Sequence, residues 1–345
     1  MQNRLLNHKI LQWITVTAVF ACFMNACQQV STRCVDQTTS GKTNISIRDN
    51  QWLINGALTY PGTRAEGLLM NLRMVNATFE DRNRPEFDSD LNTKKFIETI
   101  PQYKEQGARA FTFNLQGGMP GYEGAVNSAF NPDGTLRQAY MQRIKRVIQA
   151  CDKNGCAVIL GCFYQRQDQI LQDETSLRNG VINTVKWIKS SGFKNILLEI
   201  ANEFSHGGFD HSFLKSPEGE VELIKLAQRI YPGLLVSTSG LGDGKNHLSV
   251  ARAVDYILIH FNGTKVKDIA RRVQALKKYG KPIVCNEDDK VGQTAAGAAT
   301  ASVLNGISWG YMNKEVNQFI PFVFNGTNDD PIMYKTLKQL TSEKL

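Results

Sequence analysis

Short apolar runs alternate with amphipathic segments along most of the chain. The apolar runs end in Gly, Pro or polar turn formers, which is typical of buried parallel strands, and apolar positions in the segments between them recur at helical spacing. The expected strands are residues 68–78, 109–115, 156–163, 196–203, 234–239, 255–260, 282–287 and 307–309. The expected helices are residues 93–106, 136–153, 176–191, 218–231, 266–279 and 294–304, with a final helix near 333–340.

Eight strands, each but the last followed by a helix or a helix-containing crossover, predict an α/β protein with a single-domain (β/α)8 TIM barrel. An open doubly wound sheet is the alternative, but no Gly-rich phosphate-binding fingerprint follows the first strand. Before the barrel, alternating apolar positions around the turn at residues 48–51 predict a short hairpin, which could plug the floor of the barrel.

The N-terminus differs from the rest of the chain. Arg4 and Lys9 precede an apolar stretch at residues 10–26, which is the pattern of a secretory signal. Within this stretch and at its end, alanine is followed by Cys22 and by Cys27, and both sites resemble bacterial lipoprotein cleavage sites. We therefore expect export to the periplasm, the outer membrane or the medium, with a lipid on one of the two cysteines or an uncleaved membrane anchor as alternatives.

These features divide the chain into three parts. Residues 1–27 are the predicted signal peptide, residues 28–44 a flexible tether rich in Gln, Ser and Thr, and residues 45–345 the catalytic barrel. With 42% hydrophobic and 21% charged residues, a chain of 345 residues can bury a large core. The net charge of +8 is spread among acidic residues, so we expect no nucleic-acid partner.

The cysteines do not form a disulfide framework. Cys151 and Cys156 flank a turn and could bridge or remain free thiols. Cys and His do not cluster, so the sequence predicts neither a metal site nor a cofactor. A metal-dependent hydrolase is thereby disfavoured, and it would lose activity in a chelator.

Polar residues close most of the apolar runs. In a barrel these strand ends meet at one mouth, where reacting groups lie. The set comprises Glu80, Asp81, Arg82, Asn114, Gln116, Tyr164, Gln165, Asn202, Glu203, His260, Asn262, Asn286, Glu287, Asp288 and Trp309. Two of its glutamates, Glu203 and Glu287, each follow an asparagine. Paired carboxylates across a mouth are what glycosidic bond cleavage requires, with retention of configuration at a separation of about 5 Å and inversion at about 6.5–9.5 Å.

The run from Leu198 to Glu203 resembles the signature of clan A glycoside hydrolases, particularly the cellulase-like family five. The resemblance covers roughly residue 55 to the C-terminus. It implies a retaining hydrolase with Glu203 as acid/base, Glu287 as nucleophile and Asn202 holding the 2-hydroxyl of the sugar. His260 falls where the clan keeps an active-site histidine, and Trp309 where it keeps a sugar-stacking aromatic.

The chain departs from that pattern at three places. Phe204 stands where proline usually follows the acid/base, and Phe261-Asn262 lacks the tyrosine that often follows the histidine. The arginine common near the end of the second strand is missing, although Arg73 on the first strand could substitute for it. These departures leave open a non-catalytic carbohydrate-binding lipoprotein on the same barrel.

The expected substrate-binding residues are Asn202, His260, Trp309, Arg73, Tyr164 and Asn114, with Gln165, Glu80 and Asp81 as further subsite candidates. Trp309 and His260 could instead be ordinary core residues, and Glu199, one layer below Glu203, is expected to be a buried support. The expected partner is a carbohydrate. The sequence leaves open the sugar, the linkage, the endo or exo mode, and the oligomeric state.

Overall fold

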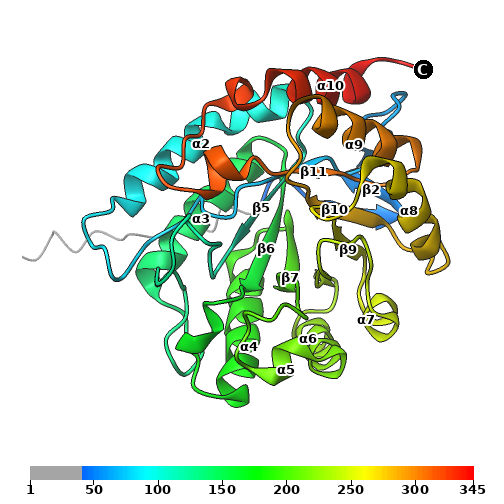
Figure 1. The fold of residues 1–345 in the computed structure, drawn as a ribbon. Coiled ribbons are helices and arrows are strands. Elements are labelled where there is room, and N and C mark those ends of the chain that lie inside the picture. The colour runs from blue at the N-terminus through cyan, green and yellow to red at the C-terminus, as the bar shows by residue number, and fades with distance from the viewer. Residues whose placement is uncertain (1–40) are drawn as a thin grey trace, which may run out of the picture. The chain divides into compact units, whose positions relative to one another are not determined.

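The computed structural model describes residues 41–345, which form an eight-stranded parallel barrel surrounded by helices (Figure 1). Six strands form one sheet in the order β11-β4-β5-β6-β7-β8, and β9 pairs with β10. Parallel bridges from Ser239 to Leu258 and from Val284 to Ser308 connect the two sheets at both edges and close the ring. The strands are β4 (Asn71–Arg73), β5 (Ala110–Asn114), β6 (Ala157–Phe163), β7 (Ile196–Ala201), β8 (Leu235–Ser237), β9 (Ile257–His260), β10 (Ile283–Glu287) and β11 (Gly310–Tyr311).

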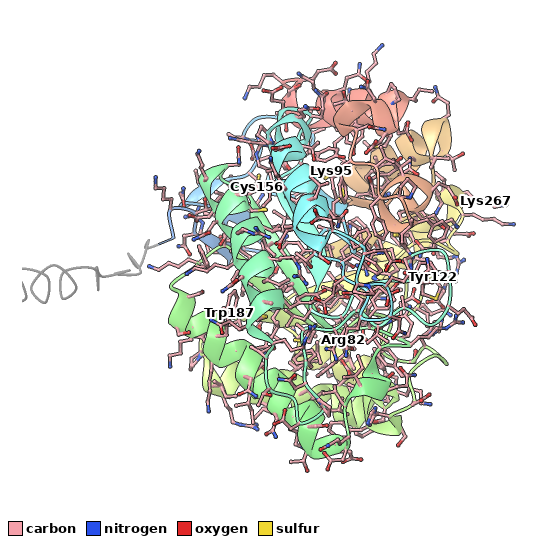
Figure 2. The ribbon with its side chains drawn as sticks, turned by 90° about the vertical axis from the view of Figure 1, so that its left-hand side faces the viewer. Arg82, Lys95, Tyr122, Cys156, Trp187 and Lys267 are labelled. Atoms are coloured by element: carbon pink, nitrogen blue, oxygen red, sulfur yellow. The ribbon has the colours of Figure 1, made fainter. Side chains whose placement is uncertain are left out.

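The predicted α/β barrel is therefore confirmed, but its first and last strands differ in length or position from the prediction. The first strand is shorter than predicted, and the last lies at Gly310–Tyr311, directly after the predicted residues 307–309. The helices are α2 (Ser89–Glu105), α3 (Gln138–Lys153), α4 (Glu174–Ser191), α6 (Pro217–Ile230), α8 (Ile269–Lys277), α9 (Gly292–Leu304) and α10 (Pro331–Ser342). Figure 2 shows α2 and α3 side by side on the outer face of the barrel.

Two short helices were not predicted, α5 (Ser212–Lys215) and α7 (Leu248–Ala253). The 3-10 turns η1 (Asp168–Ile170), η2 (Val266–Asp268) and η4 (Gly326–Asp329), and the π-helical turn η3 (Lys314–Gln318), lie in the connections. η2 lies within the helix predicted at residues 266–279, whereas the others are too short to show a periodic apolar pattern, which explains why the sequence does not reveal them. Most of them follow strands, where the loops of the barrel mouth are built.

The predicted hairpin plugs the floor. β1 (Ile45–Arg48) and β2 (Gln51–Ile54) pair antiparallel around Asp49-Asn50, whose φ angles of 51° and 62° suit a tight hairpin turn, and β3 (Ala57–Leu58) adds a third strand. Trp52 is buried, and its ring centroid lies 5.5 Å from that of Tyr256. It packs with the inward-facing side chains Leu69, Ala110, Ala157, Ile159, Leu197, Leu258 and Val284.

The upper half of the barrel interior is polar instead of apolar. Inward positions near the carboxyl ends of the strands carry Arg73, Asn114, Glu199, His260 and Asn286, all buried. Gly161 makes room for one of them, because a Cβ there would lie 2.7 Å from the Asn114 side chain. Buried polar groups are costly unless they bond to one another, so this layer must be a connected network.

Only part of the N-terminal predictions falls within the residues that the structure describes. The signal peptide and both lipoprotein-type sites lie outside the described residues. Residues 41–44, predicted as the end of the tether, are attached to the barrel instead, since the Thr43 N–H and hydroxyl bond to Asp152 at 2.7 and 2.6 Å. Within residues 41–345, no helix has the length and apolar character needed to cross a membrane. Cys151 and Cys156 are free, buried thiols, which removes the alternative of a bridge between them.

Candidate active site

Glu203 lies on a sharp turn directly after β7. Its φ of 53° places it in the left-handed region, which is uncommon for a residue other than glycine and marks strain that the surroundings must hold. Ser239, just after β8, supplies that support on both sides of the turn. Its hydroxyl accepts from the Glu203 N–H at 2.9 Å, and its carbonyl accepts from the Phe204 N–H at 3.0 Å. Proline could not make the second bond, so Phe204 fits this turn.

Glu287 ends β10 and is held from two sides. The Arg73 Nε lies 2.7 Å from its Oε2, and the Asn262 amide donates to its Oε1 at 2.5 Å. Burial acts to raise the pKa of Glu287, but the Arg73 guanidinium and the His260 imidazole outweigh it and hold that pKa below its usual value. Glu287 is therefore an ionised carboxylate at neutral pH, with its charge compensated by fixed groups.

His260 connects the two glutamates. Its Nδ1 lies 3.1 Å from Glu203 Oε1 and 3.6 Å from Glu287 Oε2. Burial opposes protonation of His260, yet the carboxylates of Glu287 and Glu203 raise its pKa. One carboxylate oxygen from each glutamate and one His260 nitrogen all lie within 4.8 Å of one another. Nearest oxygens this close agree better with the separation of about 5 Å between the carboxyl groups of a retaining glycosidase than with that of about 6.5–9.5 Å in an inverting one.

The same three residues could in principle hold a cation. However, Glu287 Oε2 already faces the Arg73 guanidinium at 2.7 Å. A metal ion there would face a second positive charge at close range, at a cost of several kcal/mol at an effective dielectric constant of about 20. The arrangement therefore favours proton transfer over metal binding.

Asn202 lies beneath the pair with both ends of its amide occupied. Its Oδ1 accepts from Arg73 Nη2 at 2.6 Å, and its Nδ2 donates to Gln165 Oε1 at 3.1 Å. Arg73 thus bonds to residues of both strands that carry the glutamates, at the place where the sequence suggested a substitute for the missing arginine. Tyr164 is nearly buried beside it, and burial raises the pKa of its hydroxyl.

Glu199 is the buried support that the sequence predicts. Its Oε1 accepts from the Ser239 hydroxyl at 2.6 Å, and its Oε2 accepts from the Asn286 amide at 3.2 Å. Burial raises the pKa of Glu199 against the opposing charges of Arg73 and His260. Ser239 also accepts from the Glu203 N–H, and Asn286 precedes Glu287, so Glu199 is connected to each half of the candidate pair through one intervening residue.

Two predicted substrate-binding residues, Trp309 and Asn114, are fully buried. Trp309 is 0% exposed, and its indole N–H donates to Asp288 Oδ2 at 2.9 Å, so its ring offers no free face for stacking on a sugar. Asn114 is also fully buried, beside Gly161, with no partner for either polar atom of its side chain. The buried ring of Trp309 corrects the expectation that it stacks on a sugar, whereas Asn114 is as buried as Asn202 and His260, and its contact with substrate stays a prediction.

Two further subsite candidates, Glu80 and Asp81, pair with neighbouring residues of the fold. Glu80 pairs with Arg82, Arg137 and Arg143, and Asp81 accepts from the Tyr122 hydroxyl at 2.7 Å. Conversely, Ser239 is not among the residues predicted from the sequence, and Asn262 is predicted only as a strand-end residue. A hydroxyl residue at the predicted end of the fifth strand is the one signal that could have pointed to Ser239.

Comparison with known structures supports the same fold. A family 5 glycoside hydrolase from Bacteroides vulgatus matches with a TM-score of 0.60 at 14% identity, over 87% of this chain and 71% of that chain. A GH5-4 broad specificity endoglucanase from Clostridium longisporum matches with a TM-score of 0.59 at 12% identity, over 86% and 99%. A β-mannanase from the blue mussel Mytilus edulis matches with a TM-score of 0.58 at 10% identity, over 88% and 97%.

A fourth match, also from Bacteroides vulgatus, covers 88% of this chain but only 60% of that one. By sequence, the chain matches no protein-family model and no curated protein. At these identities the structural likeness establishes the TIM-barrel fold of the family 5 glycoside hydrolases, at a large sequence distance from them.

Proposed function

We propose that this chain is an exported, retaining glycoside hydrolase that cleaves a poly- or oligosaccharide by double displacement. The observation that carries the proposal is the close approach of the two glutamates, whose nearest oxygens lie within 4.8 Å at the carboxyl ends of β7 and β10. A separation of about 5 Å leaves space for the anomeric carbon but not for an interposed water. The fold shared with endoglucanases and a mannanase supports the same reaction class.

In the first step, Glu203 starts protonated and Glu287 ionised. The Glu287 carboxylate attacks the anomeric carbon, and Glu203 gives its proton to the glycosidic oxygen as the bond to the leaving group breaks. A covalent glycosyl ester on Glu287 and a free sugar hydroxyl result. In the second step, Glu203 takes a proton from water, the resulting hydroxide attacks the anomeric carbon, and the Glu287 carboxylate is released.

The surrounding groups suit these roles. Arg73 and Asn262 each hold one oxygen of Glu287, which orients the carboxylate and keeps it ionised. His260 lies against both carboxylates. Its protonation can therefore respond when Glu203 loses its proton in the first step and regains one in the second. Asn202 lies next to Arg73, and the resemblance implies that Asn202 bonds to the 2-hydroxyl of the sugar, for which the second N–H of its amide is available.

The decisive experiment is hydrolysis of β-glucan and β-mannan by wild type, Glu203→Gln and Glu287→Gln. We expect each variant to lose about 10²–10⁴-fold in kcat/KM or more, with an unchanged fold by circular dichroism. Glu222→Gln is a matched control, because Glu222 is a half-exposed glutamate on α6 that pairs with Arg178. Near-normal turnover in either site variant would contradict the assignment, and binding without product would favour a carbohydrate-binding protein.

Two further measurements separate the mechanism from its alternatives. NMR of the first product should show the anomeric configuration of the substrate, and the opposite anomer would exclude double displacement. Activity should persist in a chelator, whereas its loss would favour a metal-dependent hydrolase.

We also propose export with lipid attachment at Cys22 or Cys27, on the grounds of the charged and apolar N-terminal pattern. Labelled palmitate should enter the wild-type protein in a bacterial host and should be lost in one of the variants Cys22→Ala and Cys27→Ala. If the wild-type protein takes up no label, lipid attachment is excluded, and a cleaved signal peptide or an uncleaved membrane anchor remains.

A further inference from the structure

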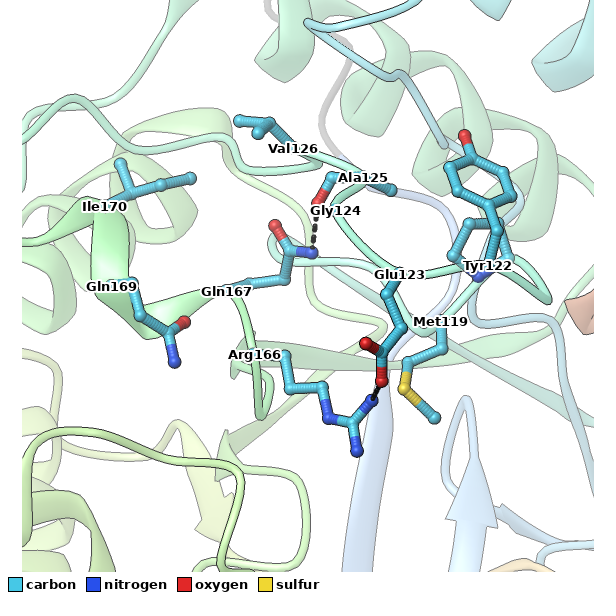
Figure 3. A pocket seen from close by; sticks show the side chains of 11 residues that line it. Met119, Tyr122, Glu123, Gly124, Ala125, Val126, Arg166, Gln167, Gln169 and Ile170 are labelled. Carbon is cyan, nitrogen blue, oxygen red and sulfur yellow. Dashed lines mark hydrogen bonds and ion pairs between the residues drawn. The ribbon is translucent and has the colours of Figure 1, made fainter.

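A pocket of about 410 Å³ lies between the loops that follow β5 and β6 (Figure 3). One part of its lining is apolar and the other carries planar polar groups. The apolar part comprises Met119, Pro120, Tyr122, Val126 and Ile170, and the polar part comprises Glu123, Arg166, Gln167 and Gln169. Its volume falls in the range of small-ligand sites, which combine apolar walls with a few placed polar groups.

The pocket is preformed. Gln167 is buried and clamps the two loops together, since its Nε2 donates to the Ala125 carbonyl at 2.7 Å and its Oε1 accepts from the Asn127 N–H at 2.9 Å. On the opposite side, the segment after β11 supports the Met119-Pro120 wall, because the Ile320 N–H donates to the Pro120 carbonyl at 3.0 Å. A ligand would therefore meet a wall that needs little ordering on binding.

The β6 side of the pocket is bonded to the loop that begins at Glu203. The Arg166 N–H donates to the Gly208 carbonyl at 2.9 Å, and Gln169 Nε2 donates to the same carbonyl at 3.3 Å. Two residues earlier, the His206 N–H donates to the Glu203 carbonyl at 2.7 Å. The loop on the β6 side of the pocket is thus hydrogen-bonded to the loop that follows Glu203.

Arg166 has an unusual backbone for its position. Its φ of 63° is in the left-handed region, and the bond to Gly208 holds it there. Its side chain reaches across the pocket opening to Glu123, with 2.7 Å between Nη1 and Oε1, and the two side chains are 46% and 85% exposed. An ion pair this exposed contributes little to stability, so both side chains are available to a ligand at little cost to the fold.

We propose that this pocket binds the saccharide unit on the leaving-group side of the scissile bond. The inference rests on the proposed function, in which Glu203 protonates the leaving oxygen, so that the leaving sugar lies on the Glu203 side. A sugar ring presents apolar C–H faces and a rim of hydroxyls, which matches the two parts of the lining. The charges of Arg166 and Glu123 cancel, which favours a neutral sugar over an acidic one.

Substrates with and without a leaving-group sugar test the proposal. Wild type and Arg166→Ala/Gln169→Ala are assayed with cellotetraose and mannotetraose, and with dinitrophenyl β-cellobioside and β-mannobioside, whose leaving group is a small phenol. We expect kcat/KM for the cleaved tetrasaccharide to fall about tenfold in the variant, in line with the loss of two hydrogen bonds, and the aryl glycoside to change less than about twofold. Arg271→Ala is the control, because Arg271 is a 65% exposed arginine paired with Asp268 on the outer surface.

The possible outcomes are distinct. Equal activity of wild type and variant on both substrate types would overturn the pocket assignment and leave the hydrolase intact. Equal losses on both types would also overturn it, because the effect would then lie at the reacting centre. If wild type cleaves neither type, the hydrolase proposal fails, and the pocket assignment fails with it. Added cellobiose or mannobiose provides a second readout, since an acceptor in this pocket should speed turnover of the aryl glycoside in wild type and not in the variant.

Discussion

Proline at position 204 should harm this protein, although the enzymes it resembles usually carry proline there. In Phe204→Pro the backbone N–H that donates to the Ser239 carbonyl at 3.0 Å is removed, and a buried carbonyl loses its partner. Proline also restricts the preceding residue to extended conformations, whereas Glu203 has a φ of 53°. The substitution therefore removes one of the two Ser239 bonds to the turn and opposes the backbone conformation of Glu203.

The magnitude follows from these two effects. Leaving a buried acceptor unpaired costs about 1–3 kcal/mol, and forcing a backbone out of its held conformation costs about 1–3 kcal/mol more. Loss of the buried phenyl ring adds a cavity cost of about 3–5 kcal/mol, which Phe204→Ala shares. We therefore expect Phe204→Pro to be about 2–6 kcal/mol less stable than Phe204→Ala.

Urea unfolding and kinetics of both variants provide the assay. Since a displacement of about 1 Å at a reacting group can cost about 10²-fold, kcat/KM should fall about 100-fold further in Phe204→Pro than in Phe204→Ala. Equal stability and equal activity of the two variants would refute the reasoning, because the backbone bond and the left-handed turn would then contribute nothing.

Three other changes test the site and its surroundings. Arg73→Lys keeps one positive charge but replaces the guanidinium 2.7 Å from Glu287 Oε2 by a shorter ammonium side chain, so the lowering of the Glu287 pKa should weaken. The acidic limb of the kcat/KM profile should then move to higher pH, and an unmoved limb would contradict the assignment. Trp309→Phe removes the bond to Asp288 and should cost about 1 kcal/mol in urea unfolding, with KM unchanged within about twofold, whereas a large rise in KM would restore the stacking role. Burial raises the pKa of Glu220 to about 8, so folding favours its neutral form; stability from this group is complete below the unfolded value of about 4.5 and is lost as pH rises through about 8. Glu220→Gln should flatten that part of the stability profile, and an unchanged slope between about pH 5 and pH 8 would show that Glu220 is not the cause.

The sequence was most informative where one strand alone carries the signal. β6 and β7 are continuous apolar runs, and their lengths and exits are read without knowledge of their neighbours. Glu203 and Glu287 stand out for the same reason, since each follows an asparagine at a strand end. β11 has only two residues, and its position depends on its pairing with β4. The strand was therefore predicted to begin three residues too early, at residue 307 instead of Gly310.

The errors concern partners that are distant in sequence. Glu80 is indistinguishable from a site residue at a strand exit until α3 brings Arg137 and Arg143 against it. Trp309 occupies a suitable strand end, but only the packed barrel shows that Asp288 takes its indole N–H and that no ring face is free. A strand-end pattern therefore identifies which residues point inward, but not how deep they lie or what already occupies them.

Glu199 shows why the spacing of the two glutamates is a property of the whole barrel. Its two oxygens bond to Ser239 and to Asn286, so a single buried carboxylate links the strand before Glu203 to its neighbour and to the strand that carries Glu287. Arg73 adds a second link, from Asn202 to Glu287. Because each link joins rigid strands, the distance between the two carboxylates is fixed before a substrate arrives, as positional catalysis requires. The Asn-Glu pairs supply the reacting groups, and the polar layer beneath them sets their geometry.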